Sequence, residues 1–272
     1  MKSIIIPAAL LAGLSPAAAF AQEEKGKAVT LSGSATIASD YRFRGVSQSD
    51  KEMAVQGGVT LSHESGLYAG VWASNLAGWG SFGGANMELD LIGGYKLPIS
   101  ATATLDAGLV WYMYPGGADE SDFAEPYVKL TGTSGPATLI AGAAYAPKQH
   151  ALANVSNASD SRGQSEDNLY LWGDGAVAIA GTPFTAKAHI GYSDGNPGLG
   201  PNGTSVAPTG RYWDWSLGVD TTWRNLTLGL SYVDTDIGGA EAARLQPNFS
   251  KGLDGTGSIA DATIVASMTA AF

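Results

Sequence analysis

Charged side chains recur at every second position in several short segments of the chain. Glu88 and Asp90 are separated by one residue, as are Lys187 and His189. Residues two apart in a strand lie on the same face, so these groups share a face, and the opposite face is mostly apolar. When such strands close into a barrel, the charged face lines its interior. Carboxylates that line a narrow, water-filled interior (the lumen) favour cations and repel anions. The predicted channel lining is Arg42, Arg44, Glu88, Asp90, Asp106, Glu125, Lys129, Asp174, Lys187, Asp214 and Asp220.

The same charges also have a structural interpretation. Lys129, Lys187 and two arginines could pair with the carboxylates and fill a plugged interior. Inward aromatic residues could narrow a passage further: Tyr112, Tyr127, Tyr170, Trp172 and Tyr212. The charge pattern by itself leaves both interpretations open.

The segment SDYRFRGVSQS is the densest mixture of charged and aromatic residues. At the top of the first predicted strand, Arg42 and Arg44 would alternate with Tyr41 and Phe43. The two arginines could form a basic rung that pairs with lumen carboxylates or touches a solute. Alternatively, they form an ion-pair cluster that fixes the first loop.

Catalytic and cofactor chemistry has little support. The chain has no cysteine, which excludes thiol nucleophiles and thiolate metal sites. His189 falls in the inward phase without a serine nucleophile signature. Asp119, Glu120 and Asp122 crowd one loop but lack the spacing of an EF-hand. We predict no catalytic residue, no metal site and no cofactor.

The elements that position these residues are short alternating strands. A typical one has Val29, Leu31 and Ile37 on one face, with Thr30 and Ser32 on the other. Twelve such strands are predicted, near 28–40, 52–63, 67–75, 86–96, 100–114, 123–132, 136–146, 166–179, 184–193, 211–221, 225–235 and 260–272.

The connections between these strands alternate strictly in length. Short turns are predicted at 63–66, 97–99, 133–135, 180–183 and 222–224, and long loops near 41–51, 76–85, 115–122, 147–165, 194–210 and 236–259. Short periplasmic turns, long external loops and an even strand number are typical of outer-membrane barrels. The pattern predicts one antiparallel transmembrane β-barrel with both termini in the periplasm.

Both ends of the chain agree with export to the outer membrane. Lys2, an apolar stretch over 4–14 and the small-x-small site at 19–21 predict a secretory signal peptide over residues 1–21. The barrel then occupies residues 22–272. The final strand ends on the aromatic Phe272, which we expect to be read by the barrel-assembly machinery.

Aromatic residues near the strand ends give an independent check. On the lipid-facing phase they would form two girdles at the membrane borders, in contact with outer-membrane lipid. The predicted girdle consists of Tyr95, Trp111, Tyr145, Phe184, Tyr192, Trp213, Tyr232 and Phe272.

Composition narrows the class of partner. Charged residues make up 15% of the chain, well below their usual share in a soluble domain. The net charge is −10. An acidic surface does not suit phosphate backbones, so no nucleic-acid partner is expected.

Several stretches also carry a family resemblance. SGSATIASDYRFRGVSQSD, GLYAGVWASN, ELDLIGGYK, LDAGLVWYMYPG, HIGYSDG, YWDWSLGVD and LGLSYVDTD follow one another through nearly the whole mature chain. Together they resemble the TorF family of porin-like proteins. The resemblance implies an outer-membrane β-barrel of porin type.

The predicted function is passive diffusion of small hydrophilic solutes, leaning to cations, in the outer membrane of a Gram-negative bacterium. A closed barrel acting as a surface receptor or structural protein is the main alternative. An outer-membrane barrel hydrolase is a weaker one.

Overall fold

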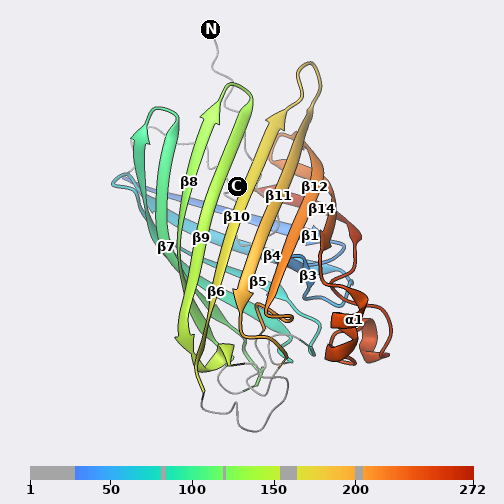
Figure 1. Ribbon diagram of the computed structural model, residues 1–272. Helices are drawn as coiled ribbons and strands as arrows, with labels where there is room; N and C mark the ends of the chain where they lie inside the picture. The colour runs from blue at the N-terminus through green and yellow to red at the C-terminus, as the bar shows by residue number, and fades with distance from the viewer. Residues whose placement is uncertain (1–27, 81–83, 119–120, 154–163, 200–204) are drawn as a thin grey trace.

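The computed structural model describes residues 28–80, 84–118, 121–153, 164–199 and 205–272. Twelve antiparallel strands close into a single barrel, as the alternation predicts (Figure 1). The predicted signal peptide, residues 1–21, lies outside the described residues. The barrel strands are β1 (Val29–Ala38), β4 (Ala54–His63), β5 (Leu67–Asn75), β6 (Met87–Ser100), β7 (Ala103–Met113), β8 (Phe123–Ser134), β9 (Ala137–Gln149), β10 (Glu166–Ala178), β11 (Phe184–Gly195), β12 (Arg211–Trp223), β13 (Leu226–Thr235) and β14 (Thr263–Ala271).

The two ends of the barrel differ in the length of their connections. Tight turns join strands at the upper end of Figure 1, and the longer connections gather at the lower end with helix α1 (Gly239–Ala242). The 3-10 helices η1 (His150–Leu152), η3 (Ala243–Leu245) and η4 (Lys251–Leu253) also interrupt long connections. We call these the short-turn end and the long-loop end. In the part of the chain that the structure describes, no helix combines the length and hydropathy of a membrane span.

Alternation along each strand separates an apolar outside from a polar inside. On β4, Val55, Val59 and Leu61 are exposed on the outer face. On β6, Glu88 and Asp90 are buried on the inner face. A closed barrel satisfies its backbone hydrogen bonds between strands, so its apolar outside can face hydrocarbon.

The predicted girdle residues lie on the outer face. Tyr192 is partly covered because its ring lies 4.9 Å from that of Trp213. The exposed members are Tyr95, Trp111, Tyr145, Phe184, Trp213, Tyr232 and Phe272. This placement fits rings at a membrane border, while contact with lipid itself stays a prediction.

The first and last strands of the barrel complete the wall. β1 pairs with β14 in antiparallel register from Ser34 opposite Ala271 to Ala38 opposite Ser267. Beyond that register, Gly33 and Phe272 exchange two backbone hydrogen bonds of 2.9 Å. No strand edge is therefore left open at this junction, which removes a site for aggregation.

One predicted turn is wrong. Leu97, Pro98 and Ile99 belong to β6, which continues to Ser100. The register shifts between Pro98 and Ser100, and such a bulge tolerates a proline because the missing N–H is not needed in the ladder.

The predicted position of the two arginines is also wrong. β1 ends at Ala38, and the next residues form a separate two-stranded hairpin, β2 (Arg42–Phe43) and β3 (Val46–Ser47). Its turn uses positive φ angles at Arg44 (48°) and Gly45 (79°), which is the pattern of a type I′ turn. We call this element the lumen hairpin because all four of its strand residues are buried and its tip contacts the inner wall.

Candidate functional site

The tip of the lumen hairpin is fixed to the opposite wall by Arg44. Its Nη2 donates to both carboxylate oxygens of Glu125 on β8, at 2.7 and 2.8 Å, and its Nη1 donates to Asn168 Oδ1 on β10 at 2.8 Å. The guanidinium carbon also lies 4.1 Å from the centre of the Tyr170 ring. A planar guanidinium suits this combination of a bidentate ion pair and an aromatic face.

Arg42 fixes the base of the hairpin. Its Nε donates to Asp40 at 2.6 Å, and its Nη1 donates to the carbonyls of Gly45 and Ile259 at 2.8 and 3.0 Å. Ser47 Oγ donates to the other Asp40 oxygen at 2.5 Å. Arg42 therefore joins the hairpin to the segment that precedes β14.

Aromatic rings fill the space between the hairpin and the wall. The Phe43 ring meets Tyr112 edge-on at 6.0 Å, and Tyr112 stacks on Phe123 at 4.5 Å. Tyr41 meets Trp72 edge-on at 5.5 Å. All of these rings except that of Trp72 are buried, and they belong to one apolar cluster in the long-loop half of the interior.

Inward glycines make room for inward aromatic rings. A Cβ on Gly142 would collide with the Trp172 ring, and a Cβ on Gly191 would collide with the Tyr170 hydroxyl. Gly142 on β9 lies directly opposite Trp172 on β10. Gly191 on β11 lies diagonally from Tyr170 on β10, two residues from the direct partner of Tyr170, which is Ser193. Glycine at these positions lets the rings lie flat against the wall.

The short-turn half of the interior is a row of ion pairs. Lys129 Nζ lies 3.5 Å from Asp106, and Lys187 Nζ lies 2.6 Å from Asp220. Lys129 and Lys187 are partly accessible, unlike the completely buried Arg44 and Glu125. Water therefore reaches this half of the lumen more readily than the half that contains the hairpin.

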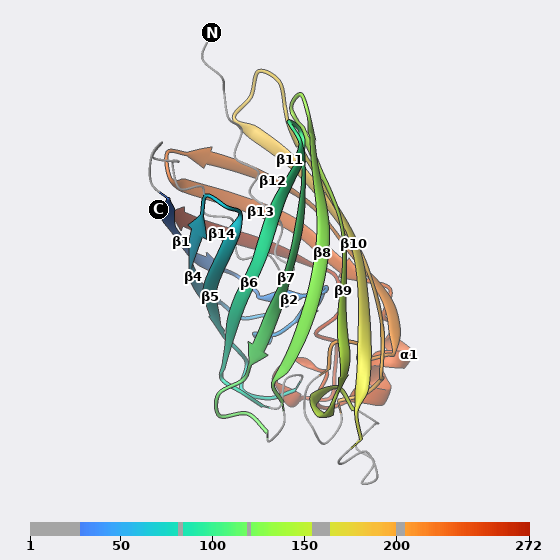
Figure 2. The ribbon, with the colours of Figure 1, turned by 90° about the vertical axis from the view of Figure 1, so that its left-hand side faces the viewer.

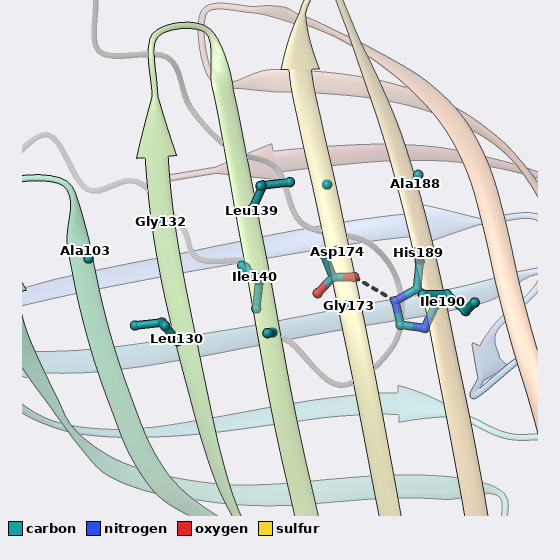
Figure 3. A pocket seen from close by; sticks show the side chains of 12 residues that line it. Ala103, Leu130, Gly132, Leu139, Ile140, Gly173, Asp174, Ala188, His189 and Ile190 are labelled. Carbon is teal, nitrogen blue, oxygen red and sulfur yellow. Dashed lines mark hydrogen bonds and ion pairs between the residues drawn. The ribbon is translucent and has the colours of Figure 1, made fainter.

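His189 lies between two carboxylates. Its Nδ1 is 2.6 Å from Asp174 Oδ1, and its Nε2 is 3.1 Å from Asp214 Oδ1 (Figure 3 shows the contact with Asp174). The Tyr170 hydroxyl is 3.0 Å from the same Nε2 and donates to Asp214. Tyr170 thus connects this cluster to Arg44 on the hairpin.

Two interior carboxylates have no basic partner among the described residues. Glu88 accepts one hydrogen bond, from the Tyr41 hydroxyl at 3.1 Å, and its second oxygen has no partner. Asp90 Oδ1 and the Tyr112 hydroxyl also lack a hydrogen-bond partner. Both carboxylates are almost completely buried.

Residues 50–52, which follow the lumen hairpin, contact residues 251–252 of the last long connection, and we call these two segments the outer cap. Asp50 accepts a hydrogen bond from the Gly252 N–H at 2.9 Å, and Lys251 Nζ lies 2.7 Å from Glu52. The hydrogen bond to Glu52 raises the pKa of Lys251, whereas burial lowers the pKa of Lys51. At the long-loop end, which is the lower end of the barrel in Figures 1 and 2, Phe249, Ile259 and Val46 belong to one buried apolar cluster.

The predicted lining residues on the barrel strands lie on the inner face, and Arg42 and Arg44 lie in the lumen hairpin. Most form ion pairs with one another, and whether any of them lines a conduction path stays a prediction. The described residues contain no group of three or more His, Asp or Glu side chains that could hold a metal, and Asp119 and Glu120 lie outside that part of the chain.

Sequence reasoning missed Asn168 and the anchoring role of Tyr170. Asn168 shares the inward phase of β10 with Tyr170 and Asp174, so alternation could have included it. No local pattern could have revealed that Arg44 would reach it, because the two residues are 124 positions apart.

A shallow groove of about 590 Å³ lies over β7 to β11. Figure 3 shows the residues around it, including Leu130, Leu139 and Ile190, which are exposed on the outer face. Small residues such as Gly132 and Gly173 form its floor. The groove combines exposed apolar side chains of the outer face with Asp174 and His189 of the interior cluster.

The fold is similar to that of solved outer-membrane channels. The NanC porin matches with a TM-score of 0.57 at 12% identity, covering 89% of this chain and 99% of that one. The outer-membrane channel DcaP of Acinetobacter baumannii gives a TM-score of 0.41 at 12% identity, covering 90% and 97% of the two chains. The likeness to NanC concerns the fold, and it agrees with the predicted β-barrel.

No curated protein matches the sequence. A family model described as "Bacterial protein of unknown function (Gcw_chp)" matches residues 22–272. The match begins at the residue where the predicted mature chain begins, while the resemblance to the TorF family stays a prediction. The chain belongs to the Gcw_chp family of bacterial proteins.

Proposed function

We propose that this protein is an outer-membrane channel for small hydrophilic solutes, leaning to cations, and that the lumen hairpin is its constriction. The proposal rests chiefly on the interior surplus of acidic groups around the hairpin. Eight interior carboxylates face five lysines and arginines and one histidine: Asp40, Glu88, Asp90, Asp106, Glu125, Asp174, Asp214 and Asp220 against Arg42, Arg44, Lys96, Lys129, Lys187 and His189. A negative potential in a narrow lumen attracts cations and excludes anions.

The hairpin can serve as a constriction because its tip is held by polar contacts. Arg44 crosses to Glu125 and Asn168 through hydrogen bonds that water can replace. Apolar packing by Phe43 against Tyr112 supports the closed position. Loss of the Arg44 contacts would leave the hairpin tip held by that packing, with Arg42 still fixing the base, so we expect the open state to gain population.

Single-channel recording in planar bilayers tests the proposal. We expect small or infrequent unitary currents from the intact barrel. A variant in which residues 42–47 are replaced by a glycine–serine linker should carry larger currents. Arg211→Ala is the matched control, because it removes an arginine that pairs with Asp194 in an exposed position. Absence of current from both the intact barrel and the linker variant would contradict the channel.

A sealed surface receptor is the second candidate, and the filled long-loop half of the lumen favours it. A buried apolar cluster that includes Val46, Phe249 and Ile259 also packs at the long-loop end. A receptor needs no passage, so this alternative predicts no current from the linker variant. The same recording therefore separates the two functions.

A further inference from the structure

Glu88 and Asp90 are exceptional among the interior carboxylates. Asp40, Glu125, Asp106 and Asp220 each lie within 3.5 Å of an arginine or lysine nitrogen. Asp174 and Asp214 share His189. Within the described residues, only Glu88 and Asp90 of this interior set lack such a basic partner.

Both carboxylates are also cut off from water. Glu88 is 0% exposed and Asp90 is 5% exposed. Removing an ionised carboxylate from water without a counter-charge is strongly unfavourable, even after the surroundings relax. Two such carboxylates on one face of a strand therefore need a bound cation, or bound protons, to neutralise their charge.

The unsatisfied atoms around the pair are all oxygens that can accept hydrogen bonds. Glu88 Oε2, Asp90 Oδ1 and the Tyr112 hydroxyl have no partner. Asp90 lies between Trp72 and Tyr112 in the strand register, and Glu88 holds the Tyr41 hydroxyl. Three free acceptors beside aromatic rings match a primary ammonium group, which has three N–H donors and a positive charge that aromatic faces attract.

A metal ion fits this place less well. Hard divalent cations take six or more oxygen ligands, and calcium sites draw on several carboxylates. The pair offers two carboxylates, and no third acidic or histidine side chain of the described chain joins them in a metal-binding group. Aromatic rings occupy much of the remaining surroundings.

We propose that Glu88 and Asp90, with Tyr112, form a binding site for the primary ammonium group of a small organic amine inside the barrel. This site identifies small organic amines as a solute class for the proposed channel. The proposal rests on the channel function only because the amine must reach the lumen. Entry from the lumen requires Tyr41 or the lumen hairpin to move aside, because these elements cover the pair. Amine binding can be measured on the purified protein in detergent, independently of any current. The site can therefore be tested even when the protein conducts no ions.

Isothermal titration of the purified barrel with n-butylamine and 1,4-diaminobutane tests the site. We expect saturable binding that weakens at least tenfold in Glu88→Gln and in Asp90→Asn. 1-Butanol, which has similar size but no charge, should not bind. Asp194→Asn is the matched control, since this carboxylate pairs with the exposed Arg211, and its affinity for the amines should be unchanged.

Four outcomes would overturn the proposal. The first is no amine binding by the intact barrel when circular dichroism shows it folded. The second is equal affinity in the folded Glu88→Gln and Asp90→Asn variants. The third is calcium binding at the pair that amines do not displace. Infrared bands of protonated carboxyl groups that are lost in both variants and unaffected by amine would likewise show that protons, and not an amine, neutralise the pair.

Discussion

At the residue scale, most buried charges of the interior lie against an opposite charge, and the pair of Arg44 and Glu125 is the most completely buried of these. Arg44 and Glu125 are both nearly inaccessible and form a bidentate pair. Such a pair adds little to the free energy of unfolding compared with apolar side chains of the same size. Removal of one partner, however, leaves the other charge buried without a counter-charge. The pair therefore specifies where the hairpin tip lies more than it stabilises the barrel.

Arg44→Ala should destabilise the folded barrel by about 3–5 kcal/mol, because Glu125 loses its buried counter-charge. Urea unfolding followed by tryptophan fluorescence measures the change. The double variant Arg44→Ala with Glu125→Ala should recover much of the loss. If the single and double variants are equally unstable, the pair is not coupled as the contacts indicate.

Gly142→Ala should destabilise the barrel by about 1–3 kcal/mol, because its methyl group would collide with the Trp172 ring. Gly132→Ala is the matched control, since a Cβ there meets no neighbouring atom within 4 Å. Melting temperatures of the two variants provide the comparison. Equal melting temperatures would mean that the ring does not pack against the wall at Gly142.

At the element scale, the sequence predicted the strands well and the hairpin poorly. Alternation identifies a strand because residues two apart share one face, and this held even for β8 with Pro126. The sequence predicts a long loop over 41–51, with Arg42 and Arg44 alternating at the top of the first strand, and the structure has a separate hairpin there. Its inward position depends on contacts such as Arg44 with Glu125, which are remote in sequence and leave no local signal.

The lumen hairpin should divide the interior into an accessible half and a sealed half. Because the chain has no cysteine, single introduced cysteines report accessibility cleanly. A cysteine at the half-buried Thr131 should react with a small charged methanethiosulfonate reagent, whereas one at the fully buried Ser193 should not. Rates of modification in proteoliposomes measure the difference.

Replacing residues 42–47 by a glycine–serine linker should make the cysteine at position 193 reactive as well. The cysteine at position 131 is the internal control, and its rate should change little. An unreactive cysteine at 193 in the linker variant would show that the outer cap, and not the hairpin, seals this half.

At the scale of the whole molecule, closure of the barrel depends on the junction of β1 and β14. Phe272 extends this junction by two backbone hydrogen bonds to Gly33. The fold class, the strand number and the polar interior could be predicted because they follow from alternation and connection lengths. The filling of the lumen could not, since it depends on how separate loops pack together, as Val46, Phe249 and Ile259 do.

Deletion of Phe272 should lower the fraction of barrel that assembles in the outer membrane, because the two backbone bonds to Gly33 and one girdle ring are lost together. Phe184→Ala removes a girdle ring without affecting the junction and serves as the control. The fraction with the faster mobility of folded barrel in unheated gels measures assembly. Equal fractions for the two variants would contradict a special role for the junction.

The reversal potential across a planar bilayer with a tenfold gradient of potassium chloride tests the central claim most directly. The acidic surplus of the interior predicts a cation-selective potential, and Glu88→Gln combined with Asp90→Asn should move it toward zero. Asp194→Asn should leave it unchanged. An anion-selective potential in the intact protein would contradict the account.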